Sequence, residues 1–154
     1  NTAVDLFFCL DASGLAAGET IKKGDYNIQA MTDQSAAVAI GSITYDTTTV
    51  EAPYITTYEG YNQRIFIDNR GAVGAYYSTT FTTEDGVTAA AGASATGTVP
   101  ANTMVVIRVA DLVTFTGGTR GAATMEVEAT DANIWVTTQI VDLGTGMTDT
   151  LVLN

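Results

Sequence analysis

The sequence predicts an all-β fold: a single domain over residues 1–154, built as an antiparallel β-sandwich of Ig-like or jelly-roll-like type. Valine, isoleucine, threonine, tyrosine and phenylalanine recur with a period of two along nearly the whole chain. Gly, Asp, Asn and Pro interrupt this pattern roughly every 8 to 12 residues, a spacing typical of sandwich strands. Helical periodicity is missing almost everywhere. A chain of 154 residues is long enough to bury about two thirds of its unfolded surface.

The period-two segments place the strands along the chain. In the first half, strands are expected over residues 3–11, 25–31, 36–45, 52–58 and 63–69. In the second half, they are expected over residues 75–83, 95–99, 103–110, 122–130, 133–141 and 147–153. A short helical turn is expected at 109–113 or 12–17, and the Ala- and Gly-rich stretch 89–97 is expected to be an exposed loop or an edge strand.

Two strands near the carboxyl end show the pattern most clearly. Apolar residues at odd positions from Ala123 to Ala129 alternate with Thr and Glu at even positions, which predicts one buried and one wet face. Residues 134–141 are apolar on both faces, so this strand is expected to be central, with Trp135 in the core or in an interface. Residues 131–133 between the two strands predict a short hairpin connection, and Gly117-Gly118 predicts another hairpin turn.

The charge balance limits the classes of partner that the chain is expected to bind. Six Lys and Arg residues against 17 Asp and Glu give a net charge of −11, and the few cations are scattered. Nucleic acid binding needs clustered cations, so neither nucleic acids nor anionic membranes are expected partners. No apolar run reaches the roughly 18 to 20 residues of a membrane-spanning helix. The first residue is Asn1, from which we expect a mature chain that has lost a targeting peptide, and hence an extracellular or cell-surface location.

The residue inventory argues against catalysis, so the chain is not expected to be an enzyme. It has no histidine, the usual general base and commonest transition-metal ligand, and its serines therefore lack a base. Glu126 and Glu128 are expected to be neighbours on a solvated strand face rather than a catalytic pair. Oxygen ligands make calcium more plausible than zinc, but the aspartates show no calcium-loop spacing, and no metal or other cofactor is assigned.

The segment GYNQRIFIDNRG, residues 60–71, resembles segments of uncharacterised secreted bacterial β-rich surface proteins. The turn TEDG at 83–86 and the terminal TDTLVLN resemble the same proteins. This resemblance implies secretion. It carries over no activity and no site residue.

The amino-terminal strand is unusually apolar for a free end. Either it completes its own sandwich, or it inserts into a neighbouring subunit by β-strand addition. Cys9 within it is expected to be a buried thiol, an intersubunit disulfide partner or an attachment point. The residues of this candidate assembly strand are Val4, Leu6, Phe7, Phe8, Cys9 and Leu10.

Composition also suggests self-association, because only two lysines and two prolines are available to protect strand edges. The leading hypothesis is an extracellular structural subunit that forms a pilus-like or matrix filament, a homopolymer held by donor-strand exchange. Its partner is then a second copy of itself. The alternative is a carbohydrate- or surface-binding module that contacts polysaccharide through exposed aromatic rings. Its candidate residues are Tyr54, Tyr58, Tyr61, Tyr76, Tyr77 and Trp135.

Overall fold

The computed structural model describes residues 24–28 and 38–153. The chain divides into two compact units, Asn1–Thr44 and Tyr45–Asn154. In the first unit, β1 (Gly24–Ile28) pairs with β2 (Val38–Ile43) in an antiparallel ladder with an irregularity after Tyr26. The expected strand at 3–11 and the alternative helical turn at 12–17 lie outside the described residues.

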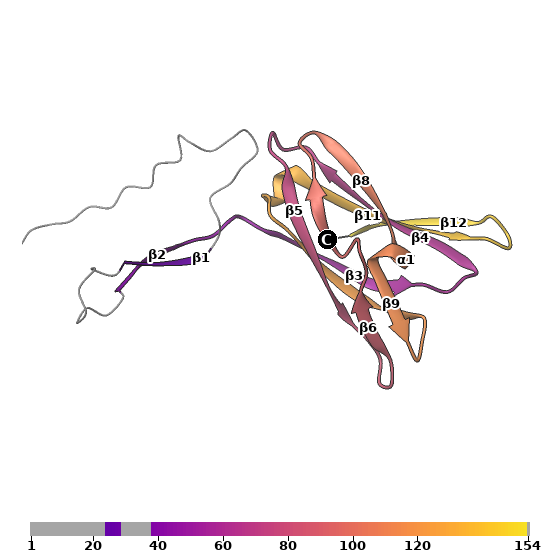
Figure 1. The fold of residues 1–154 in the computed structure, drawn as a ribbon. Coiled ribbons are helices and arrows are strands. Elements are labelled where there is room, and N and C mark those ends of the chain that lie inside the picture. Colours follow the sequence, from indigo (N-terminus) through magenta and orange to yellow (C-terminus); the bar gives the residue numbers. More distant parts are fainter. Residues whose placement is uncertain (1–23, 29–37, 154) are drawn as a thin grey trace, which may run out of the picture. The chain divides into compact units, whose positions relative to one another are not determined.

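The second unit contains two four-stranded antiparallel sheets, which confirms the predicted all-β sandwich (Figure 1). Sheet I has the order β3 (Thr48–Thr56), β10 (Arg120–Val127), β5 (Ala75–Thr82) and β7 (Thr96–Val99). Sheet II has the order β12 (Thr148–Leu153), β11 (Ile134–Asp142), β4 (Tyr61–Asn69) and β8 (Thr103–Arg108). A further two-stranded ladder joins β6 (Thr88–Ala91) to β9 (Val113–Thr116), and the one-turn helix α1 (Val109–Leu112) links β8 to β9.

The core lies between the two sheets because the alternating strands turn their apolar faces toward each other. In β10, Ala123, Met125 and Val127 are buried, as the odd-position pattern predicts. The expected central position of β11 is also confirmed, since it pairs with both β12 and β4. The largest apolar side chains that are almost fully enclosed are Ile55, Ile65, Ile67, Leu112, Val99, Val109, Val113 and Val127.

Both predicted hairpin connections are wrong. Residues 131–133 form a 3-10 turn that crosses from sheet I to sheet II, because β10 already has β3 and β5 as neighbours while β11 has β4 and β12. Gly117-Gly118 joins β9 to β10, but β9 pairs with β6 instead of β10. Turn residues mark where a chain can reverse; they do not determine which strand becomes the partner.

Smaller differences concern individual elements. The helical turn expected at 109–113 is present as α1, and stretch 89–97 contributes to the edge-type strands β6 and β7. Strand β9 was not predicted, and β3 begins at Thr48, four positions before the expected start. Trp135 is 52% exposed and therefore does not belong to the core.

Candidate functional site

An open groove runs between the edge strands of the two sheets. Among the described residues, β3 pairs only with β10 at the edge of sheet I, and β12 pairs only with β11 at the edge of sheet II. Three hollows of about 460, 200 and 390 Å³ lie along these strands. The first two share Leu153, and the second and third share Tyr54, Ile140 and Asp149. We call this chain of hollows the edge groove.

None of the described strands covers the apolar side chains that face the space between the sheets at this edge, and the groove is therefore open there. Leu153 and Leu151 lie on the same face of β12, two residues apart. Leu153 is only 6% exposed, whereas Leu151 is 53% exposed and lines the groove together with Tyr54. A half-exposed leucine on an inward strand face leaves the core incomplete along this edge.

The edges of β3 and β12 differ in how well they are protected against pairing with a further strand. In β3, Pro53 and Tyr54 together oppose the single residue Ala122, because the register shifts between Ala52 and Ile55. Proline and a bulge are the devices by which natural sheets block further pairing. Strand β12 has neither proline nor lysine, and its ladder with β11 is regular. Its one protecting feature is the Asp149 side chain, which lines the groove on the same face as Leu151. The edge of β12 is therefore the better template for an added strand.

A buried glutamine holds the groove wall in place. Gln63 Oε1 accepts the Thr56 N–H at 2.7 Å, and its Nε2 donates to the Tyr54 carbonyl and to Thr138 Oγ1, each at 3.1 Å. The Thr138 hydroxyl in turn donates to the Arg64 carbonyl at 3.1 Å. These bonds satisfy the backbone groups around the bulge of β3 and tie β3 to β4 and β11 across the sandwich.

Sequence reasoning missed Gln63, although a signal was present. Gln63 occupies the same inward parity in β4 as Ile65 and Ile67, so a polar side chain stands where the pattern expects an apolar one. Such a residue is normally buried with partners. Asn69 continues the same parity at the other end of β4 and is 1% exposed.

The end of the groove near the β11–β12 hairpin gathers tyrosines and carboxylates. Tyr54 and Tyr61 line the hollow of about 390 Å³ with Asp142, Asp149 and Met147. The Asp142 carboxylate is engaged in its own turn, where Oδ1 accepts the backbone N–H groups of Gly144 at 2.8 Å and Thr145 at 3.1 Å. These two bonds lower the pKa of Asp142, with the Gly144 bond the larger cause.

The remaining candidate residues lie at scattered places in the sandwich. Of the six aromatic candidates only Tyr77 is buried; Tyr54, Tyr58, Tyr61, Tyr76 and Trp135 are exposed. Trp135 lines the hollow at the opposite end of the groove from Tyr61. Glu126 lies on the exposed outer face of sheet I, and Glu128 follows the end of β10. The six residues of the assembly strand, from Val4 to Leu10, lie outside the described residues.

Within residues 24–28 and 38–153, no three Asp, Glu, Cys or His side chains converge in a way that could hold a metal ion. No helix in the same part of the chain is long and apolar enough to cross a membrane. Comparison of the chain with protein-family models, with curated proteins and with solved structures finds no significant match.

Proposed function

We propose that this protein is an extracellular structural subunit that assembles into a filament by β-strand addition, with the amino-terminal segment of one copy occupying the edge groove of the next. The observation that carries this proposal is the open groove beside the edge of β12, which is less protected than the edge of β3. A contact of this kind is heterologous, because the donor and the acceptor are different surfaces. Heterologous contacts that do not close into a ring produce fibres.

The amino-terminal segment has the right length and periodicity for this groove. The six residues of β12 extend over about 20 Å at 3.3 Å per residue, and residues 4–10 would extend over about 23 Å. Every second residue of the donor would point into the hollows. Those residues are Val4, Leu6, Phe8 and Leu10.

Burial provides the driving force. Enclosing Leu6, Phe8 and Leu10 is worth on the order of 5 to 8 kcal/mol at about 2 kcal/mol per side chain. The donor would also cover Leu151, which is 53% exposed. Backbone hydrogen bonds to β12 would add direction and register, as in other strand additions. Together these terms offset the ordering of the donor segment.

The first test changes the groove and leaves the donor intact. Leu151→Arg places a charge in the groove, and Leu143→Arg is the matched control, because Leu143 is similarly exposed at 59% but lies outside the lining. Negative-stain microscopy should show filaments for the unaltered chain and for Leu143→Arg, and single subunits for Leu151→Arg. Filaments of normal length from Leu151→Arg would contradict the proposal.

The second test removes the donor. A chain lacking residues 1–11 should form no filaments, and an added peptide of residues 3–11 should bind it with an affinity that Leu151→Arg weakens. If the segment instead completed its own sandwich, the deletion would lower thermal stability without any effect specific to assembly. That outcome would refute the exchange.

A carbohydrate-binding function is the second candidate, because Tyr54 and Tyr61 stand exposed around one hollow together with Asp149. Tyrosine rings can stack on sugar rings while carboxylates accept bonds from hydroxyls. Retention on insoluble polysaccharide that is lost in Tyr54→Ala with Tyr61→Ala would support it. Absence of retention on a glycan array and on polysaccharide would remove it.

A further inference from the structure

The outer faces of the two sheets carry opposite charge. The described residues include four arginines, and three of them, Arg64, Arg70 and Arg108, lie on or over the outer face of sheet II. The outward residues of sheet I instead include Glu51 and Glu126. This separation stands out in a chain whose net charge is −11.

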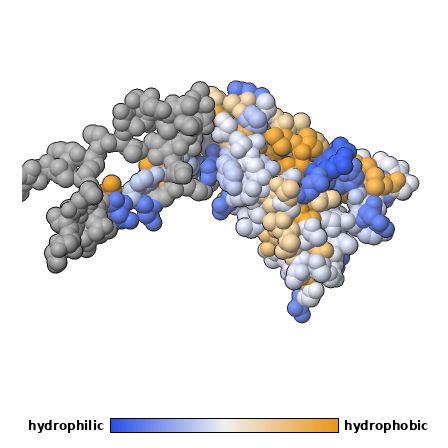
Figure 2. All heavy atoms as spheres, viewed as in Figure 1, coloured by the Kyte–Doolittle hydropathy of each residue, from blue (hydrophilic) through white to orange (hydrophobic). Residues whose placement is uncertain are grey.

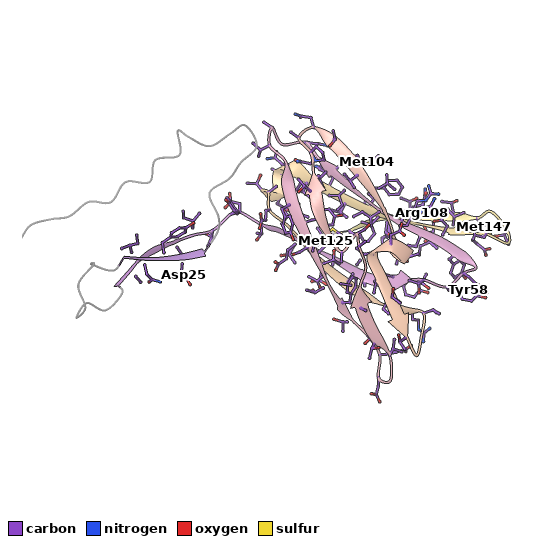
Figure 3. The ribbon with its side chains drawn as sticks, viewed as in Figure 1. Asp25, Tyr58, Met104, Arg108, Met125 and Met147 are labelled. Carbon is purple, nitrogen blue, oxygen red and sulfur yellow. The ribbon has the colours of Figure 1, made fainter. Side chains whose placement is uncertain are left out.

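The outer face of sheet II combines cations with an apolar row. Register places Val152, Thr137, Phe66 and Val106 side by side across all four strands. Val106 is 47% exposed and Val152 is 56% exposed. Figure 2 shows the hydrophobic surface over β8 beside a strongly hydrophilic area, where Figure 3 places Arg108.

Two of the arginines on this face have no compensating carboxylate among the described residues. Arg64 and Arg108 are direct cross-strand partners, and in the described part of the chain neither forms an ion pair. Arg64 Nε is also buried without a hydrogen-bond acceptor. Arg70, by contrast, pairs with Asp68 at 2.8 Å and stacks 4.6 Å from the centre of the Trp135 ring.

The outer face of sheet I is acidic and rich in threonine. Glu126 lies between Thr49 and Ser78 in the register, and Glu51 accepts a bond from Thr124 Oγ1 at 3.0 Å. The arginine at the start of β10, Arg120, is neutralised by Glu84. The exposed threonines on this face are Thr49, Thr80, Thr82, Thr96 and Thr98.

We propose that the outer face of sheet II of one copy docks on the outer face of sheet I of a second copy. Arg64 and Arg108 would meet Glu51 and Glu126, and the apolar row would pack on threonine methyl groups. This contact uses outward side chains of the sheets, whereas the edge groove is lined mainly by inward ones. Thr49 and Val152 border both surfaces, but the four charged residues of the contact lie outside the groove lining. Its role is lateral association between filaments or between free subunits.

The area indicates how strong the contact is. Four strands spaced by about 4.8 Å, with about six residues each, present roughly 400 Å² per copy, or about 800 Å² in total. Stable specific interfaces usually bury more than about 1,200 Å². An isolated pair should therefore associate weakly, and many such contacts along two filaments should hold them together by avidity. Charge pairing at exposed sites also makes the contact sensitive to salt.

The test is a charge exchange in the full chain carrying Leu151→Arg, which removes strand addition from the measurement. Sedimentation equilibrium at low ionic strength should show weak self-association that high salt abolishes. Arg64→Glu with Arg108→Glu, and separately Glu51→Arg with Glu126→Arg, should each weaken it at least about 10-fold. A mixture of the two double variants should associate again, which also shows that both are folded.

A charge-preserving variant is the matched control. Arg64→Lys with Arg108→Lys should keep most of the association, because the charge remains. Failure of the mixture to associate, or unchanged association of the double variants, would overturn the proposal. Loss of dextran sulfate binding in the Arg-to-Glu variant with unchanged self-association would assign the face to anionic polysaccharide instead. If Leu151→Arg still forms filaments, the proposal of strand addition is refuted. The face-to-face contact can then still be tested, because reversing its charges in either double variant should make the filament bundles narrower.

Discussion

Replacing Gln63 with leucine should destabilise the sandwich by about 1 to 4 kcal/mol. The substitution leaves the Thr56 N–H and the Tyr54 carbonyl without partners at a site where Gln63 is only 3% exposed. A buried group that loses its partner costs about 1 to 3 kcal/mol. The two groups together cost about 2 to 6 kcal/mol, and the more favourable burial of leucine returns about 1 to 2 kcal/mol. Thr138 keeps its bond to the Arg64 carbonyl and adds little.

Urea unfolding followed by circular dichroism measures this difference, and the matched control is Gln139→Leu. Gln139 lies on the outward face of β11, and its one side-chain bond is a 3.4 Å contact with Thr150. Its replacement should change the free energy of unfolding by less than about 0.5 kcal/mol. If the two variants have the same stability, the Gln63 bonds do not hold β3 to sheet II and the reasoning is wrong.

Three further predictions follow from local geometry. Asn69→Ala should lower the free energy of unfolding, measured in urea, by about 3 kcal/mol. The Asn69 side chain donates to the carbonyls of Val73, Val99 and Pro100 and accepts the Gly71 N–H. Asn62→Ala, on the outward face of the same strand, should leave the stability nearly unchanged. Gly117→Ala should lower the melting temperature clearly more than Gly146→Ala, since both glycines have positive φ but only at Gly117 would the added Cβ lie 2.5 Å from the Gly86 carbonyl oxygen; equal losses would show that the loop relaxes. The pKa of Asp142 is lower in the folded chain than its ordinary value of 3.8. The ionised carboxylate therefore stabilises the turn above pH 3.8, and this stability is lost as the pH falls through the shifted pKa. Protection of the Gly144 amide from hydrogen exchange should fall in acid, and in Asp142→Asn this protection should not depend on pH.

The period-two pattern was sufficient to predict the fold class and most strands, because side-chain burial alternates with the backbone in every sheet. It could not predict the partners of those strands. The sequence between β10 and β11 is consistent with a hairpin, yet Val127 pairs with Thr48 and Tyr77 while Ile134 pairs with Asn69. Pairing over such distances depends on how whole faces fit together, which local turn chemistry does not encode.

The edge groove could not be predicted from the sequence for the same reason. Its existence depends on β3 and β12 both lying at the edge on one side of the sandwich, which only the complete topology determines. Strand β12 itself was predicted within one residue, but Leu151 could not be distinguished from Leu153 by pattern, because both occupy the same parity. Gln63 and Asn69 are the exceptions, because two polar residues in the inward row of β4 are visible in the sequence.

The pairing of β3 with β10 imposes a delay during biosynthesis between the synthesis of β3 and its incorporation into sheet I. Strand β3 has no partner until β10 is made, and Arg120 follows Thr56 by 64 residues. At about 5 to 20 residues per second, a ribosome needs roughly 3 to 13 s to cover that distance. During this interval the backbone groups of β3 have no partner strand, and an unpaired strand edge is a site at which a nascent chain can aggregate. A ribosome stalled before the codon for Arg120 should hold a chain in which only the β5–β7 ladder of sheet I can form, whereas a chain that extends past Val127 contains every strand of that sheet.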